Sequence, residues 1–133
     1  MKKFILLMII GGAFVFTGVV EAKLLPRFTK TNKILVISPK LRRDRLALIL
    51  TLSNLQKVNN ITYTLMYQTN GKDEGVSGTI DSSAGPSATR ELLFGTCSAG
   101  VCRYHSNITD MKLEIVSELP NGKQTLKRYR IKV

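Results

Sequence analysis

The feature that most constrains the fold is a strict two-residue alternation in the middle of the chain. In residues 45–53 every second residue is a leucine, and these are Leu46, Leu48, Leu50 and Leu52. A period of two places the four leucines on one face of a β-strand, whereas a helical period would scatter them around the axis. The alternation therefore predicts a strand whose leucine face lies in a core.

Four further segments have the composition of strands. Residues 34–37 form an apolar run that we expect to be a buried or edge strand and to end at Ser38-Pro39, because proline cannot donate to a central ladder. Residues 61–68 are rich in β-branched and aromatic side chains, and Asn70-Gly71 begins a turn region that reaches Gly75. The last two segments are a short partner strand that includes Val76, Gly78 and Ile80, and a less regular strand over residues 88–94.

The C-terminal segment predicts a β-hairpin with a defined register. A two-residue turn at Asn121-Gly122 would set Ile115 against Arg128 and mix apolar and charged faces. A three-residue loop that starts at Pro120 keeps the faces apart, and burial of one face sets the register. We therefore expect a type I turn followed by Gly122 in the left-handed conformation. The expected pairs are Leu113 with Tyr129, Met111 with Ile131, and Glu114 with Arg128.

Together these segments predict one all-β domain over residues 33–133. Six or seven short strands separated by turn signals, without a helical period, favour an antiparallel β-sandwich. Residues 46–133 resemble a fibronectin type III or immunoglobulin-like module, with the leucine strand as its second strand, residues 61–67 as its third and the final hairpin as its last two. The resemblance implies a binding or spacing role without a shared active site.

The N-terminus has the layout of an export signal, for which we expect a helix over residues 1–22. Lys2 and Lys3 precede seventeen uncharged residues, 4–20, and Val20-Glu21-Ala22 offers small residues for cleavage. Residues 23–32 then form a basic lead-in linker. The alternative is a retained anchor that holds the protein to a membrane through residues 4–20. The expected location is therefore secreted or at the cell surface.

The charge balance is strongly basic. The chain carries a net charge of +11, and removing residues 1–22 takes away two basic residues and one acidic residue, which leaves +10. Such a surface attracts anionic polymers. The candidate anion-binding residues are Arg128, Arg130, Lys132 and Lys112. A second basic cluster comprises Lys40, Arg42, Arg43 and Arg45.

Cys97 and Cys102 are the only cysteines, and in an oxidising compartment we expect them to form a disulfide. With His105 they could instead hold a metal ion, but a structural zinc site needs four ligands. They could also remain free thiols. We expect a disulfide, no metal, no cofactor and no catalytic residues.

These features favour a non-enzymatic, exported β-sandwich that acts as a binding or structural module at or outside the cell surface. The sequence does not identify the partner, for which the candidates are a surface protein and an anionic polymer. The first alternative is a cationic binder of extracellular nucleic acid or of an anionic wall polymer. It would bind through the basic stripe of Arg128, Arg130 and Lys132. The second alternative is a small thiol-dependent or metal-dependent protein centred on Cys97, Cys102 and His105.

Overall fold

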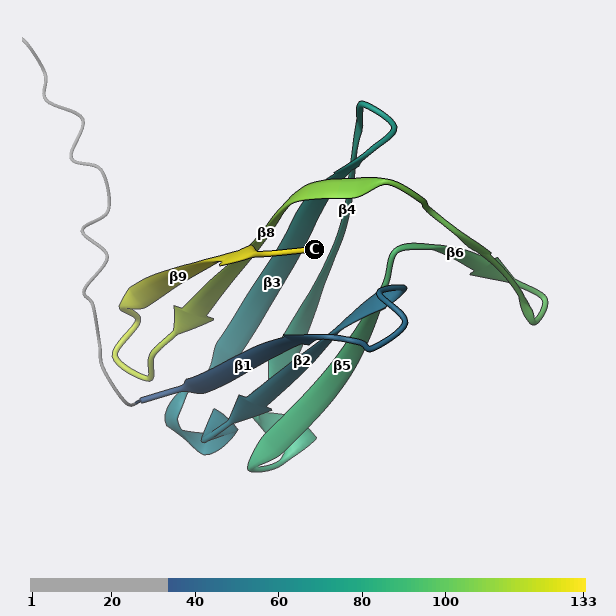
Figure 1. Cartoon of the computed structure of the whole chain (residues 1–133). Coiled ribbons are helices and arrows are strands. Elements are labelled where there is room, and N and C mark those ends of the chain that lie inside the picture. The colour runs from purple at the N-terminus through teal and green to yellow at the C-terminus, as the bar shows by residue number, and fades with distance from the viewer. Residues whose placement is uncertain (1–33) are drawn as a thin grey trace, which may run out of the picture.

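A computed structural model describes residues 34–133 of the chain (Figure 1). The predicted signal helix in residues 1–22 and the lead-in in residues 23–32 lie outside the described residues. Regular structure within residues 34–133 consists of antiparallel β-strands and two short 3-10 helices. The all-β class is therefore confirmed for this part of the chain, in which no helix is long and apolar enough to span a membrane.

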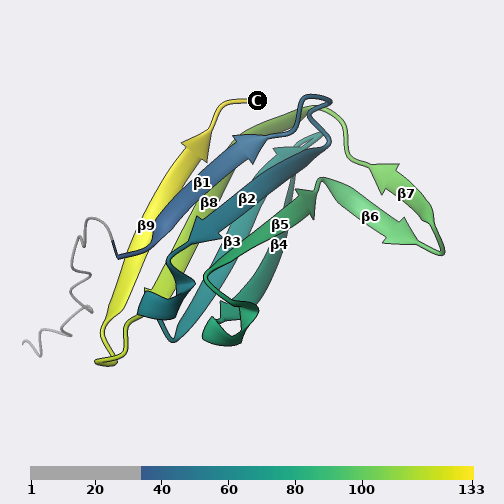
Figure 2. The ribbon, with the colours of Figure 1, turned by 90° about the horizontal axis from the view of Figure 1, so that it is seen from below.

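Seven of the strands form two sheets. The first sheet has the order β1-β2-β5, with the bounds Val36–Leu41, Ala47–Ser53 and Ser87–Leu93. The second sheet has the order β4-β3-β8-β9, with the bounds Lys72–Asp81, Asn60–Thr69, Ile108–Glu118 and Gln124–Ile131. The short helices η1 (Leu55–Lys57) and η2 (Ser82–Ala84) lie in the connections. Figures 1 and 2 show the two sheets facing each other, which is consistent with a β-sandwich.

One hydrophobic core fills the space between the sheets. Leu48, Leu50 and Leu52 of β2 are fully buried, so the predicted leucine face is confirmed for these three, whereas Leu46 precedes β2 and is half-buried. The facing sheet contributes alternate residues of β3 and β8, and Phe94, just after β5, is fully buried among them. Each such side chain stabilises the fold by roughly 1.5–3 kcal/mol when it leaves water. The core therefore depends on the two-residue period that the sequence displays.

The prediction that Ser38-Pro39 ends the first strand is wrong. Strand β1 runs through Pro39, which pairs with Leu50 of β2. β1 is the outer strand of its sheet, so only one of its sides needs backbone donors. A proline is tolerated there because its missing N–H removes no ladder bond when that position faces outward.

The turn after β3 is also shorter than expected. The predicted turn region reaches Gly75, but the turn contains only Asn70 and Gly71, and β4 begins at Lys72. Both turn residues have positive φ, 49° and 76°. This is the backbone that a two-residue hairpin requires and that Asn-Gly supplies at little cost. β4 is consequently a full ten-residue strand rather than a short one.

The final hairpin has the predicted register. Leu113 pairs with Tyr129, Met111 with Ile131, and Glu114 with Arg128. The amide of Gly122 donates to the carbonyl oxygen of Leu119 at 2.9 Å, and Gly122 has a φ of 77°. The expected left-handed glycine is therefore present, and burial of one face did select this register over the two-residue alternative.

Candidate functional site

A separate hairpin projects from the molecule between β5 and β8. It consists of β6 (Gly95–Ser98) and β7 (Val101–Tyr104), which pair only with each other among the described strands. Figure 1 shows it extending away from both sheets, and all residues from Thr96 to Tyr104 are exposed. Its turn residues, Ala99 and Gly100, have φ values of 50° and 78°. The sequence predicted only a local cysteine turn here, so the projection is a new finding.

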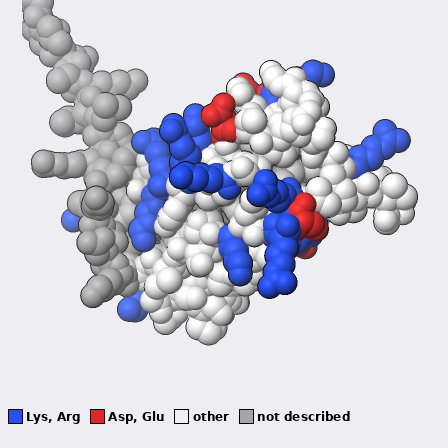
Figure 3. All heavy atoms as spheres, viewed as in Figure 1, with Lys and Arg blue, Asp and Glu red and all other residues white. Residues whose placement is uncertain are grey.

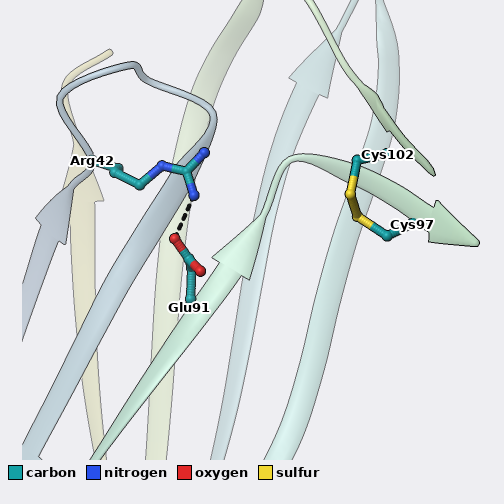
Figure 4. The surroundings of a disulfide bond; sticks show 4 residues. All are labelled: Arg42, Glu91, Cys97 and Cys102. Carbon is teal, nitrogen blue, oxygen red and sulfur yellow. Dashed lines mark hydrogen bonds and ion pairs between the residues drawn. A yellow bond between two sulfur atoms is a disulfide. The ribbon is translucent and has the colours of Figure 1, made fainter. Parts of the chain in front are cut away.

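The two cysteines lie directly opposite each other in this hairpin and form the disulfide (Figure 4). Their Cα atoms are 4.0 Å apart. A bond that closes so short a segment restricts the unfolded chain by roughly 2 kcal/mol. Because β6 and β7 bury little apolar surface, the disulfide is the main covalent restraint on their shape.

The hairpin has two different faces. Alternation along β6 and β7 puts the disulfide on one face and four other side chains on the opposite face: Thr96, Ser98, Val101 and Arg103. These four line an open hollow of about 380 Å³. Val101 is an apolar residue that is 67% exposed. We refer to these four residues as the hairpin face.

The base of the hairpin is fixed to the core. The backbone amide of Phe94 donates to the carbonyl oxygen of Leu46 at 3.0 Å, and the amide of His105 donates to the carbonyl oxygen of Phe94 at 2.8 Å. The ring of Phe94 contacts Tyr67 edge to face, with the centroids 5.3 Å apart. Burial raises the pKa of Tyr67, and Glu74 adds to the effect. A Cβ at Gly95 would collide with the backbone of β7, so only glycine allows the two strands to approach this closely at the base of the hairpin.

His105 bonds to Tyr67 rather than to a cysteine. Its Nδ1 atom lies 3.0 Å from the Tyr67 hydroxyl oxygen. Both sulfur atoms are in the disulfide, so neither is a thiolate nucleophile in this form. Within residues 34–133 no group of three or more His, Cys, Asp or Glu side chains is placed to hold a metal ion. These side chains therefore have structural partners in this part of the chain.

The second basic cluster contains a structural arginine. Arg42 forms ion pairs with Asp44 at 2.7 Å and with Glu91 of β5 (Figure 4). Hydrogen bonds to Asp44 and then to Glu91 hold the pKa of Arg42 above its usual range, and the bond from Arg42 lowers the pKa of Asp44. Arg42 thus joins the β1–β2 turn to β5, close to the base of the hairpin. Lys40, Arg43 and Arg45 remain exposed.

The predicted basic stripe is only partly assembled. Lys112 of β8 lies opposite Arg130 of β9, on the outer face of the sheet. Arg128 projects from the same face, but its Nε bonds to Glu114 at 2.7 Å. Lys132 follows β9 directly and is exposed. Figure 3 shows Lys and Arg side chains gathered on the face seen in Figure 1, with few acidic residues between them.

An open hollow at the far end of β3 and β4 was not predicted from the sequence. It has a volume of about 500 Å³, and we call it the acidic hollow. Its lining includes Met66, Gly75, Asp73, Glu74, Asp110 and Lys112. Asp110 has a φ of 48° where the pairing of β3 and β8 shifts register, between Met66 and Gln68. A bulge of this kind depends on how two distant strands pair, which no local pattern reports.

The chain was compared with protein-family models, with curated proteins and with solved structures, and none of the three comparisons found a match.

Proposed function

We propose that this protein is an exported, non-enzymatic β-sandwich that binds a partner at or outside the cell surface. The partner we favour is a surface protein, bound through the hairpin face. The proposal includes the fibronectin type III or immunoglobulin-like identity. Two antiparallel sheets around one core support that identity, with the leucine strand, residues 61–67 and the last hairpin in the order that the resemblance implies. Modules of this kind act through loops and surfaces rather than through a shared active site.

The observation that carries the proposal is the projecting hairpin itself. A disulfide and a fixed base hold nine exposed residues, Thr96 to Tyr104, in one shape, and these residues add almost nothing to the core. A rigid surface of this kind loses little conformational entropy on binding. Val101 supplies an apolar contact, Arg103 a cation and the two hydroxyl groups hydrogen bonds, which together suit a protein surface.

The test is a pull-down from the native surface fraction with matched variants. Val101→Ser combined with Arg103→Glu should remove the captured partner, because both changes alter the hairpin face. Lys123→Glu reverses a charge in the exposed β8–β9 turn, away from the hairpin, and should leave capture unchanged. Equal capture by wild type and by the hairpin variant would refute the proposed site.

A second candidate function is the binding of an anionic polymer. The observation in its favour is the direct pairing of Lys112 with Arg130, since like charges opposite each other destabilise a sheet. Phosphate groups of a nucleic acid or acidic groups of a wall polymer would relieve that repulsion.

The competing explanation is that these cations only prevent other strands from pairing with the sheet edge. Binding to an anionic matrix would then depend on the net charge and not on where the charges lie. Arg130→Gln with Lys132→Gln should therefore lower the salt concentration that elutes the protein from an anionic matrix. Arg43→Gln with Arg45→Gln removes the same charge elsewhere and should lower it less. Equal shifts for the two pairs would show that only net charge matters.

The thiol-dependent or metal-dependent alternative receives no comparable support. The cysteines are joined to each other and His105 is bonded to Tyr67. Thiol titration of the exported protein tests this alternative directly. Two free thiols per chain would support it, and none would contradict it.

A further inference from the structure

β4 has an edge that no described strand covers. It pairs with β3 along its whole length, from Lys72 to Asp81, and with no other strand in residues 34–133. In an antiparallel strand, alternate residues direct their backbone N–H and C=O groups away from the existing partner. Such an edge can accept an additional extended segment.

The other three edges carry features that deter such pairing. β1 contains Pro39, and the pairing of Arg90 with the buried Leu50 puts a charge of β5 on the core side. On β9, Lys127 lies on the core side, and its Nζ donates to the carbonyl oxygen of Leu35 at 3.1 Å. Prolines and inward charges are the usual means of protecting edge strands. These three edges are therefore poor acceptors.

β4 is protected only at its beginning. Its charged residues, Lys72, Asp73 and Glu74, come first, and from Gly75 to Ile80 it has no charge and no proline. The register with β3 is continuous, so no bulge twists the edge away. Six residues of this edge are thus open to pairing.

The acidic hollow lies beside this edge and indicates the kind of segment that would fit. Gly75 is part of its lining, and a side chain is excluded there because a Cβ would come within 2.8 Å of the Leu65 carbonyl oxygen. Met66, 39% exposed, offers an apolar contact. Three carboxylates against one lysine line the hollow, whereas the protein as a whole is strongly basic. A segment with cationic and large apolar side chains would match both properties.

We propose that residues 23–33 of a second copy of this chain add to the free edge of β4 as a further strand. This segment has four basic residues and no acidic residue, and it contains Leu24, Leu25 and Phe28. Its eleven residues are enough to pair with the six open residues of β4 and to reach Asp73 and Glu74. Pro26 is tolerated in such an outermost strand where its position faces away from β4. Its cations meet the acidic hollow, and its apolar side chains meet Met66.

The segment comes from another copy because of where β1 begins. The bond from Lys127 to Leu35 places the start of β1 beside β9, three strands from β4 in the sheet order. Figure 2 also shows β1 next to β9. Crossing three strand spacings of about 4.8 Å each would consume residues that the pairing needs. Because each copy then carries one donor segment and one acceptor edge, the contact either closes as a two-fold dimer or continues into rings or open chains.

Complementation between two defective variants tests this arrangement in chains produced by a secreting host. Arg27→Glu with Lys30→Glu spoils the added segment but leaves β4 intact. Ser77→Lys puts a charge on the free edge but leaves the segment intact. Light scattering after size exclusion should show concentration-dependent oligomers for the wild type and monomers for each variant alone. An equal mixture of the two variants should form a heterodimer.

Thr62→Lys is the matched control, because Thr62 lies on the same outer face but on the interior strand β3. This variant should associate like the wild type. A second measurement adds a synthetic peptide of residues 23–33 to the Arg27→Glu, Lys30→Glu chain, and amide resonances of Gly75 to Ile80 should shift. Circular dichroism checks that every variant is folded.

Several outcomes would overturn the proposal. A wild type that stays monomeric at high concentration removes it. Loss of association in Ser77→Lys without rescue in the mixture would indicate pairing of two β4 edges instead. Loss in Thr62→Lys would indicate a general charge effect, and a peptide that leaves β4 unshifted would place the segment elsewhere. None of these results depends on the hairpin face, so they leave the proposed function untouched.

Discussion

The hydroxyl oxygen of Tyr67 lies 3.0 Å from Nδ1 of His105, and this hydrogen bond joins two residues that are 38 positions apart. Tyr67 belongs to β3, and His105 is the first residue after the projecting hairpin. The bond therefore ties the residue that follows the hairpin to β3, an interior strand of the larger sheet.

Tyr67→Phe should destabilise the protein by about 1 kcal/mol, because it removes this bond while keeping the buried ring. Urea unfolding measures the change. Tyr129→Phe is the control, since Tyr129 is half-buried and has no side-chain hydrogen bond among the described residues, and its effect should be smaller. Equal effects would mean that the Tyr67–His105 bond contributes nothing of its own.

Gly122→Val should destabilise the protein by roughly 1 to 2 kcal/mol, because a β-branched residue tolerates positive φ poorly. Gly122→Asn should cost clearly less, since asparagine adopts the left-handed conformation more readily. Denaturation midpoints of the three proteins provide the comparison. A midpoint for the valine variant close to that of the wild type would contradict the strained turn.

Replacing both cysteines by serine should loosen the hairpin by up to about 2 kcal/mol. The effect should be local, because β6 and β7 lie outside the core. Hydrogen exchange should accelerate in residues 95–104 and change little for the buried amides of β2 and β3. Uniform acceleration across the whole domain would show that the disulfide supports the sandwich itself.

Arg42→Gln should raise the titration midpoint of the Asp44 carboxyl group towards its usual value, because the bond from Arg42 is the largest cause of its lowered pKa. A carboxyl group with a lowered pKa in the folded state stabilises the fold at higher pH, and that contribution disappears as the pH falls through the folded pKa. Carbon NMR of the side-chain carboxyl groups measures the midpoint. Asp81, whose pKa is lowered by Ser83, should keep its midpoint in the same variant.

Local patterns were sufficient to predict the interior of this fold. Leu48, Leu50 and Leu52 are buried because a period of two places them on one face of the strand, and that face packs against the other sheet. The register of the last hairpin followed from keeping Leu113 and Tyr129 on the same face. In both cases the deciding quantity is burial along one strand pair, which the sequence displays directly.

Features that depend on neighbouring strands could not be predicted in this way. Pro39 lies within a strand because β1 is at an edge, and edge position follows from the whole sheet. The ion pair of Arg42 with Glu91 and the bond of Tyr67 with His105 each join distant segments. The candidate sites therefore emerged from tertiary packing, although their cysteines and basic residues were recognisable in advance.

The disulfide of the projecting hairpin also affects how freely this protein can change during evolution. The disulfide joins Cys97 to Cys102 below the tip of the hairpin. The distance between the two strands at this point is therefore set by the bond and does not depend on the residues between the cysteines. Ala99 and Gly100 contact no part of the core, and an inserted peptide at this point would leave the folding of the domain intact. The turn of Ala99 and Gly100 is therefore a place in the described chain where new sequence carries little risk to the fold.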